Sequence, residues 1–291
     1  MAPCYRLACV NGGPACGPLP ARDRPCDPRV WDSAGDNQAM RDTPRARRFE
    51  RDGFLPVEGL LRLPEIEEFR AVYDRFLSGA IDVGRRRSDL GAGAPSQRPG
   101  VENITQVMWP SDSLPDLLAS PAYERALAVA REILGDDLAF DFDMLIDKAP
   151  DTATPTPWHQ DCAYWIDLPD RRAASCWIAL DDATVENGCM WFVPGSHRLP
   201  MRSHRPAGKG GGALECDGSE SEGVPVPLAA GSCTFHHGGT MHYSRGNSTA
   251  RRRRALIVNF RPQAMVELER ARGFDHGREA PGRENRNPLT R

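Results

Sequence analysis

Two metal-binding side chains stand close together in the stretch Trp158-His159-Gln160-Asp161. His159 and Asp161 are two positions apart, and alternate side chains of an extended strand point to the same face. The imidazole and the carboxylate could therefore reach one point in space. Two histidines and one carboxylate leave coordination positions open, and this set suits non-haem Fe(II) in oxygen chemistry. The pair predicts a metal site, provided that a second histidine joins it.

Several histidines compete for the third ligand position. His236 and His237 lie on or just after an apolar segment, and His242 follows the turn Gly238-Gly239. Spacing alone leaves these three histidines comparable. The other candidates fall in turns or polar loops: His197, His204 and His276.

Length and charge restrict the class of protein. The chain has 291 residues, 40% of them hydrophobic, which is enough for one large domain with a sizeable core. A formal net charge of -3 provides no bulk attraction to nucleic acid or to a membrane surface. No segment approaches the ~18 consecutive apolar residues of a membrane-spanning helix. We expect a small-molecule substrate and neither a nucleic-acid nor a membrane partner, and the oligomeric state stays open.

The cysteines bear on the compartment. There are nine, an odd number, and none form a Cys-x-x-Cys pair, which disfavours a zinc knuckle or a thioredoxin motif. The apolar stretch Leu7-Ala8-Cys9-Val10 is too short for the core of a secretory signal. We expect a reduced, cytoplasmic protein.

Composition divides the chain into three parts. Residues 1–44 are rich in Pro, Gly, Cys and charge without a periodic pattern, so a disordered N-terminal tail is expected. Residues 45–262 carry the patterns of a folded domain, and residues 263–291 form a C-terminal extension.

Helices are expected mainly in the first half of the domain. Residues 49–61 indicate a short helix, a glycine turn and a strand. A helix opens at Leu63, with proline in its first turn and an apolar stripe at helical spacing as far as Leu77. Residues 114–134 indicate two helices broken at Ser120-Pro121.

After residue 135 the period of the hydrophobic pattern changes to two, which is typical of strands. One face of the first strand would hold four apolar side chains: Phe140, Phe142, Met144 and Ile146. Further short strands are expected near residues 174–181, 189–193, 224–228, 231–237 and 255–261. Residues 79–100 and 205–223 are expected to be long loops. Many short strands with glycine-rich turns predict a sandwich or barrel.

Six motifs follow one another at set intervals. They are Lys148-x-Pro150, Trp158-His159-Gln160-Asp161, Trp177-Ile178-Ala179-Leu180, Glu186-Asn187-Gly188-Cys189, Pro194-Gly195-Ser196-His197 and His242-x-Ser244-x-x-Asn247-Ser248. Arg253 follows His242 by eleven residues. In order and spacing these motifs resemble the phytanoyl-CoA dioxygenase family, over about residues 46 to 262.

The resemblance implies a mainly β fold with flanking helices, a double-stranded β-helix (jelly roll, cupin-like). It also implies Fe(II), 2-oxoglutarate as cosubstrate and O2, with ascorbate as a reductant. His159, Asp161 and His242 match the iron ligands of the family. The resemblance thus selects His242 over His236 and His237.

The resemblance implies a cosubstrate pocket as well. Arg253 matches the partner of the distal carboxylate of 2-oxoglutarate, with Ser244 beside it, and Met144, Gln160 and Trp177 match positions that line the pocket. A guanidinium holds a carboxylate with two charge-assisted hydrogen bonds, which lysine cannot reproduce.

Strand geometry does not fix two of these assignments. Strict alternation turns Gln160 away from its two neighbours. Apolar residues follow the run Arg251–Arg254 on both strand faces, so hydrophobicity does not identify the arginine that faces the pocket. The interval from His242 makes the choice, and it selects Arg253.

These residues predict an Fe(II)- and 2-oxoglutarate-dependent dioxygenase that hydroxylates, or otherwise oxidises, a small organic molecule such as a secondary metabolite. Succinate and CO2 would be released. Asp161 favours hydroxylation, because related halogenases replace the carboxylate by a small residue. A non-catalytic metal-binding jelly roll and a zinc-dependent hydrolase are the alternatives, since the same ligand set occurs at zinc. Neither gives a reason for Arg253.

Overall fold

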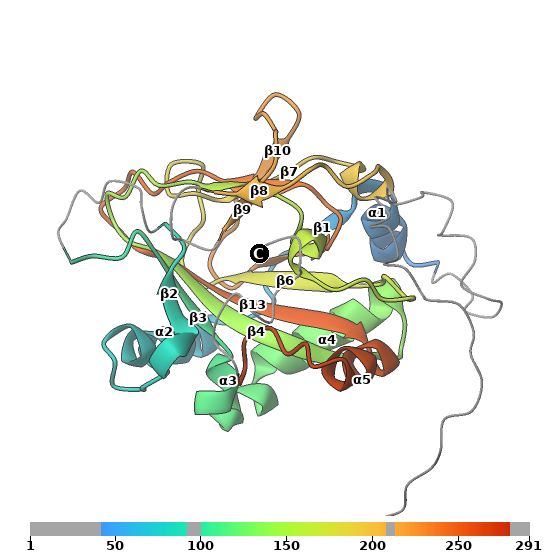
Figure 1. The fold of residues 1–291 in the computed structure, drawn as a ribbon. Helices are drawn as coiled ribbons and strands as arrows, with labels where there is room; N and C mark the ends of the chain where they lie inside the picture. The colour runs from blue at the N-terminus through green and yellow to red at the C-terminus, as the bar shows by residue number, and fades with distance from the viewer. Residues whose placement is uncertain (1–41, 92–99, 208–212, 280–291) are drawn as a thin grey trace, which may run out of the picture.

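The computed structural model describes residues 42–91, 100–207 and 213–279. Within them, two antiparallel sheets lie face to face, and helices cover the outer side of the larger sheet (Figure 1). The larger sheet has the strand order β1-β11-β6-β13-β4-β3-β2, and the smaller has the order β10-β7-β12-β5. This architecture confirms the jelly roll.

The bounds of the elements follow. The larger sheet contains β1 (Phe54–Val57), β2 (Arg87–Asp89), β3 (Ile104–Met108), β4 (Leu138–Lys148), β6 (Ala174–Ala179), β11 (Cys233–His237) and β13 (Arg253–Pro262). The smaller sheet contains β5 (Thr156–His159), β7 (Met190–Phe192), β10 (Val224–Val226) and β12 (His242–Ser244). The helices are α1 (Pro44–Asp52), α2 (Leu63–Leu77), α3 (Pro110–Ser113), α4 (Pro121–Leu134) and α5 (Gln263–Ala271), with 3-10 turns η2 (Gly84–Arg86), η3 (Pro115–Ala119), η4 (Asp161–Tyr164) and η5 (Ser196–Arg198). The helix from Leu63 and the break before Pro121 are as expected.

Local sequence sets both ends of α1. The hydroxyl of Thr43 accepts a hydrogen bond from the Ala46 backbone N–H at 3.1 Å and so caps the first turn. Gly53 ends the helix at φ 79°, a left-handed conformation that glycine adopts without steric cost. The chain then enters β1 directly.

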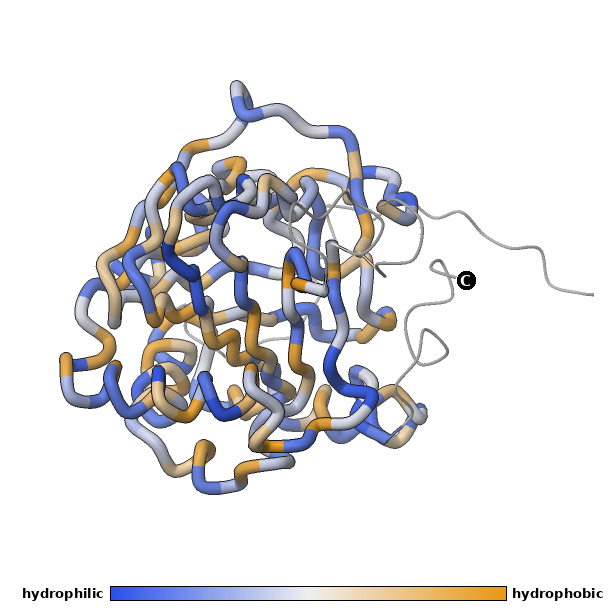
Figure 2. Tube along the Cα trace, turned by 90° about the vertical axis from the view of Figure 1, so that its left-hand side faces the viewer, coloured by the Kyte–Doolittle hydropathy of each residue, from blue (hydrophilic) through white to orange (hydrophobic). Residues whose placement is uncertain are grey.

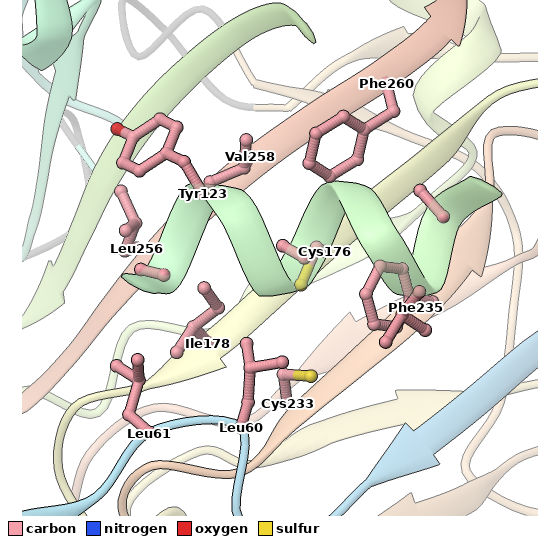
Figure 3. Close-up of a cluster of buried hydrophobic side chains, with 14 of the residues drawn as sticks. Leu60, Leu61, Tyr123, Cys176, Ile178, Cys233, Phe235, Leu256, Val258 and Phe260 are labelled. Atoms are coloured by element: carbon pink, nitrogen blue, oxygen red, sulfur yellow. The ribbon is translucent and has the colours of Figure 1, made fainter. Parts of the chain in front are cut away.

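The main core lies between the larger sheet and α4. Side chains of β6, β11 and β13 face this helix (Figure 3): Cys176, Ile178, Cys233, Phe235, Leu256, Val258 and Phe260. Burial of each Leu, Ile or Phe side chain stabilises the folded state by roughly 1.5–3 kcal/mol. This layer of side chains therefore stabilises the packing of the sheet against the helix. The alternate residues of the same strands point to the other side, into the space between the sheets.

Strand β4 departs from the expected alternation at Asp141. Its pairing with β13 shifts register between Phe140 and Phe142, so Asp141 is the extra residue of a β-bulge. Phe142 faces the space between the sheets, whereas Phe140 packs against the core on the helix side. The expectation of one face from Phe140 to Ile146 is therefore wrong for Phe140.

Two segments that were expected to be loops contain short strands. β2 lies within residues 79–100, and a hairpin of β8 (Arg205–Pro206) and β9 (Leu214–Glu215) lies within residues 205–223. Part of each segment falls outside the described residues. Strands of two or three residues are too short to show a period of two in the sequence.

The described residues include segments on both sides of the expected domain, 45–262. Residues 1–41 of the expected tail lie outside the described residues, whereas Pro44 is the first residue of α1 and Thr43 caps that helix. In the C-terminal extension, α5 contacts β4 and β13 and lies beside the larger sheet (Figure 1). Residues 263–279 are therefore part of the folded body.

Hydrophobic residues occur in short stretches along the described chain (Figure 2). Among the helices that the structure describes, none has both the length and the apolar character to cross a bilayer.

Candidate active site

A cavity of about 170 Å³ lies between the two sheets. Its walls come from β4, β6 and β13 of the larger sheet, from β5, β7 and β12 of the smaller sheet, and from the segment after α5. The cavity contains two groups of polar side chains that sequence reasoning had singled out. One surrounds Asp161, and the other is the guanidinium of Arg253.

His159, Asp161 and His242 come together from β5, the turn after it, and β12. His242 is the cross-strand partner of His159, and their ring centroids are 4.1 Å apart. Oδ1 of Asp161 lies 3.6 Å from Nε2 of His159 and 3.4 Å from Nε2 of His242. The three ligand atoms all lie within 4.8 Å of one another, which is close enough to bind one ion.

The two histidines present the correct nitrogen for a metal. Nδ1 of His159 lies 2.8 Å from the carbonyl oxygen of Pro157, and Nδ1 of His242 lies 2.9 Å from that of Thr240. Each Nδ1 therefore carries the proton, and each Nε2 keeps its lone pair for the ion. Burial, and then the charge of His242, lowers the pKa of His159, which favours the neutral ligand form. The donor set fits a divalent iron ion.

The two oxygens of Asp161 have different surroundings. Oδ1 faces the two histidines, whereas Oδ2 lies 2.8 Å from Oγ of Ser175 and accepts a hydrogen bond from Nε2 of His236 at 3.1 Å. Burial alone would raise the pKa of Asp161. The three surrounding imidazoles, including the hydrogen bond from His236, outweigh burial and hold that pKa well below its usual range. The carboxylate is ionised, and Oδ1 is its oxygen for a metal.

Arg253 is buried at the start of β13 and lines the cavity. Its Nε and Nη1 make no hydrogen bond within the described residues, and its guanidinium lies 5.1 Å from the ring of Trp177. Burial lowers the pKa of Arg253 to about 10, so the group still carries its charge at neutral pH. A buried cation without an anionic partner is costly, so this position is suited to receive an anion.

The neighbouring arginines point elsewhere. Arg252 and Arg254 each form an ion pair with an aspartate, and Arg251 is exposed. Of the four, only Arg253 lines the cavity. The structure thus distinguishes the arginine that strand parity left open.

Three further predicted residues line the cavity: Ser244, Met144 and Trp177. Gln160 does not. Its side-chain nitrogen donates to the carbonyl oxygen of Gly239 at 2.7 Å, and its side-chain oxygen accepts from the backbone N–H of Arg202 at 2.9 Å. The structure gives Gln160 a position behind the site, in agreement with strand alternation and not with the pocket position implied by the resemblance.

Sequence reasoning missed two features of the cavity. The resemblance passed over His236, although it contacts Asp161, and the only signal for it was its place among the candidate ligands. Most of the far end of the cavity was missed as well: Phe142, Asn259, Phe274 and His276 line it. Two of these residues belong to the C-terminal extension, whose polar composition gave no sign of a role.

Solved structures with similar folds include proteins in complex with 2-oxoglutarate. EvdO2 from Micromonospora carbonacea var. aurantiaca, complexed with 2-oxoglutarate, is 29% identical with a TM-score of 0.60, and the match covers 75% of this chain and 90% of that chain. The epimerase SnoN from nogalamycin biosynthesis, in complex with Fe3+, alpha ketoglutarate and nogalamycin RO, is 30% identical with a TM-score of 0.58, over 74% of this chain and 81% of that one.

Curated relatives carry the same family name. Phytanoyl-CoA dioxygenase domain-containing protein 1 of Mus musculus is 34% identical over 123 residues, which are 40% of this chain and only 42% of the mouse protein. A probable phytanoyl-CoA dioxygenase of Caenorhabditis elegans is 25% identical over 230 residues, 74% of this chain and 73% of that protein. The sequence model of the family described as Phytanoyl-CoA dioxygenase (PhyH) matches residues 49–255, well over half of the chain. The chain belongs to the phytanoyl-CoA dioxygenase family.

Proposed function

We propose that the protein is an Fe(II)- and 2-oxoglutarate-dependent dioxygenase that hydroxylates, or otherwise oxidises, a small organic molecule and releases succinate and CO2. The observation that carries the proposal is the buried guanidinium of Arg253, which lies in the same cavity as the ligand set and finds no hydrogen-bond partner for Nε and Nη1 among the described residues. A metal-binding protein without activity, or a zinc hydrolase, needs the ligands but gives no reason for this cation. The biosynthetic context of SnoN supports a secondary metabolite as the substrate.

The chain's own residues divide the work. His159 and His242 would hold the metal through Nε2, and Asp161 through Oδ1. Iron supplies the redox chemistry with O2 and 2-oxoglutarate when it is bound. Arg253 would hold the distal carboxylate of 2-oxoglutarate through two charge-assisted hydrogen bonds, and Trp177 beneath the guanidinium restrains its plane.

The walls around the cosubstrate end are apolar. Met144, Met190 and Ile257 line the cavity together with Trp177. Apolar walls exclude water, and a drier site strengthens the attraction between Arg253 and a carboxylate. These apolar side chains carry no charge that could attract a carboxylate. One carboxylate of the cosubstrate would therefore pair with Arg253, and its other end would point toward the ligand set.

The test is oxygen-dependent succinate release. The purified apoprotein is loaded with Fe(II) or Zn(II) and given 2-oxoglutarate with and without O2, and succinate is measured. We expect release with Fe(II) and O2 only, and its loss in His242→Ala. The matched control is His237→Gln, which changes a nearby buried histidine outside the cavity. Metal binding without succinate release under any of these conditions would contradict the proposal and favour the non-catalytic protein or the hydrolase.

A further inference from the structure

Beside the ligand set, the cavity contains a further region that is distant from Arg253 along β13. Strand register gives the direction: on β13, Arg253 lies at the first residue and Asn259 six residues further on, opposite Phe142 of β4. Oδ1 of Asn259 lies 2.7 Å from Oγ of Ser175, which lies 2.8 Å from Oδ2 of Asp161. Asn259 has Ser175 of β6 as its partner on one side and Phe142 of β4 on the other, so the ligand set lies on the β6 side of Asn259 and Phe142 on the β4 side. The part of the cavity around Phe142 is left for a second molecule.

This end of the cavity is formed by aromatic faces. The ring of His276 stacks on Phe142 with centroids 3.8 Å apart and an interplanar angle of 19°. Phe274 meets His276 edge-on at 4.9 Å, and Trp165 lines the same region. Flat aromatic surfaces of this kind bind other planar rings by stacking or by edge-to-face contact.

A buried charge cluster fixes His276 in this place. Its Nε2 lies 3.2 Å from Oε2 of Glu269 and 3.4 Å from Oδ2 of Asp141, the bulge residue of β4. Asp141 also pairs with Arg261 at 2.8 Å and with Arg270 at 2.6 Å. Asp141, Glu269 and His276 resemble a metal site, but the two guanidiniums already balance the two carboxylates. A divalent cation would add uncompensated charge, so the cluster is a structural latch.

The backbone of the latched segment is held as well. His276 adopts φ 54°, a left-handed conformation that is uncommon outside glycine. The indole N–H of Trp109 donates to the carbonyl oxygen of Asp275 at 3.1 Å, and Arg270 donates to that of Phe274 at 3.1 Å. A strained residue that is held from several sides is typical of a ligand-binding wall.

The polar groups at this end indicate the charge of its ligand. Nδ2 of Asn259 is buried and has no hydrogen-bond partner within the described residues, so an acceptor on a ligand would satisfy it. Among the described residues, Arg253 is the only arginine or lysine that lines the cavity. Arg261 lies behind Trp165, 4.2 Å from its ring, and is bonded to Asp141. At this end, a carboxylate or phosphate would therefore face no arginine or lysine of the described lining.

We propose that this end of the cavity is the subsite for the oxidised substrate, and that it takes a neutral molecule with a planar ring and a hydrogen-bond acceptor. Phe142, Trp165, Phe274 and His276 hold the ring, and Asn259 donates to the acceptor. The C-terminal segment then determines specificity, since it supplies two of the four ring-binding side chains. This inference rests on the proposed function, which places 2-oxoglutarate at the other end.

The test measures binding without turnover. The full-length protein, loaded with Fe(II) and 2-oxoglutarate under anaerobic conditions, is titrated by calorimetry with three probes. Coumarin is planar and neutral with a carbonyl acceptor, coumarin-3-carboxylate adds a negative charge to the same ring, and hexanamide keeps an acceptor without a ring. We expect coumarin to bind at least about tenfold more tightly than either of the others. Equal or tighter binding of the carboxylate or of hexanamide, or no binding of coumarin, overturns the proposal.

Two phenylalanines of β4 provide a matched pair of variants. Phe142→Leu removes a ring from the subsite, and Phe140→Leu makes the same change on the opposite side of the bulge. Loss of one aromatic contact should weaken coumarin binding about three- to tenfold in Phe142→Leu and leave it unchanged in Phe140→Leu.

Two further variants test the acceptor and the histidine ring. Asn259→Leu should weaken the binding of coumarin but not that of naphthalene, which is a planar ring without a hydrogen-bond acceptor. His276→Gly, which tolerates the left-handed backbone, should weaken both aromatic probes.

Affinity for 2-oxoglutarate separates the two proposals. It should be the same in wild type, Phe142→Leu and Phe140→Leu. Equal effects of the two phenylalanine changes on coumarin, or a loss of 2-oxoglutarate affinity in Phe142→Leu alone, overturn the subsite while the proposed function stands. Failure of the wild-type protein to bind 2-oxoglutarate overturns the proposed function and the subsite with it.

Discussion

Nε2 of His236 donates a hydrogen bond to Oδ2 of Asp161 at 3.1 Å, on the side of the carboxylate that faces away from the two ligating histidines. The Nδ1 atoms of His159 and His242 are fixed by backbone carbonyls, whereas Nδ1 of His236 has no hydrogen-bond partner within the described residues. His236 therefore differs from the ligands in its anchoring. It is a positioning residue that occupies one carboxylate oxygen and leaves the other for the metal.

Replacing His236 by phenylalanine should loosen Asp161 without emptying the space. Loss of a hydrogen bond to a ligating carboxylate costs about ten- to a hundredfold in metal affinity. Calorimetric titration of Fe(II) under anaerobic conditions measures this, and the visible spectrum of the Co(II)-loaded protein reports the change in coordination. His237→Gln serves as the control. An unchanged affinity and an unchanged Co(II) spectrum in His236→Phe would show that the contact is only structural.

Arg253→Ala should weaken 2-oxoglutarate by about ten- to a hundredfold, because a hydrogen bond to a charged group contributes roughly 1.5–3 kcal/mol. Iron affinity should change much less, since the ligand set remains. Arg253→Lys should rescue only part of the loss. The dependence of succinate release on 2-oxoglutarate concentration is the measurement, with the exposed Arg251→Ala as the control. A large loss in Arg251→Ala with a normal Arg253→Ala would contradict the assignment.

Asp143 should make stability depend on pH. Burial raises the pKa of Asp143 to about 6, although Tyr123 and Ser111 donate hydrogen bonds to it. The folded state thus binds more protons than the unfolded chain between pH ~4 and ~6. The stabilisation is complete below pH ~4 and is lost as the pH rises through ~6.

Asp143→Asn, which resembles the protonated form, should therefore be more stable than wild type at pH 8, by up to about 3 kcal/mol at 1.36 kcal/mol per pKa unit. The two proteins should be similar at pH 4.5. Urea unfolding at both values gives the comparison. A difference that does not change with pH would show that Asp143 titrates normally.

The start of α1 determines how far the N-terminus can be shortened. A chain that begins at Met40 keeps the cap from Thr43 and the proline at Pro44, and it should match the full-length protein in stability. A chain that begins with Met before Arg45 loses both and should be less stable by about 1 kcal/mol. The urea midpoint distinguishes the three proteins. A Met40 chain that is markedly less stable than full length would show that residues 1–39 contribute to the fold.

Local signals indicated a sandwich or barrel and the pair His159-x-Asp161, whereas the jelly roll and the choice of His242 came from the family resemblance. The pair His159-x-Asp161 places two ligands from one short stretch, and the period of two marks most of the longer strands. Sequence reasoning could not choose among four arginines by physics alone, because β13 is buried on both faces. Leu256 and Val258 face the helices, while Arg253 and Ile257 face the cavity. When both faces of a strand are hydrophobic, the alternation of residues does not show which face points to the cavity.

The β-bulge at Asp141 and the charge cluster around it could not be predicted from the sequence, for a different reason. Phe140, Phe142 and Met144 alternate regularly, and no neighbouring residue indicates that Asp141 is the extra residue of a bulge. Asp141 is held by side chains more than a hundred residues away, among them Arg261. Long-range pairs of this kind have no local pattern.

The pairing of His159 with His242 also links metal occupancy to the mechanics of the smaller sheet. β5 is the edge strand of that sheet, β12 is its one neighbour within the described residues, and His159 is its last residue. An ion bound by both histidines would cross-link the two strands and, by mass action, stabilise the state in which β5 is paired with β12. Chelation should therefore speed amide hydrogen exchange in β5 first, while the seven-stranded sheet keeps its protection. Loss of the ion would therefore open the edge strand β5 locally under conditions in which the rest of the protein stays folded.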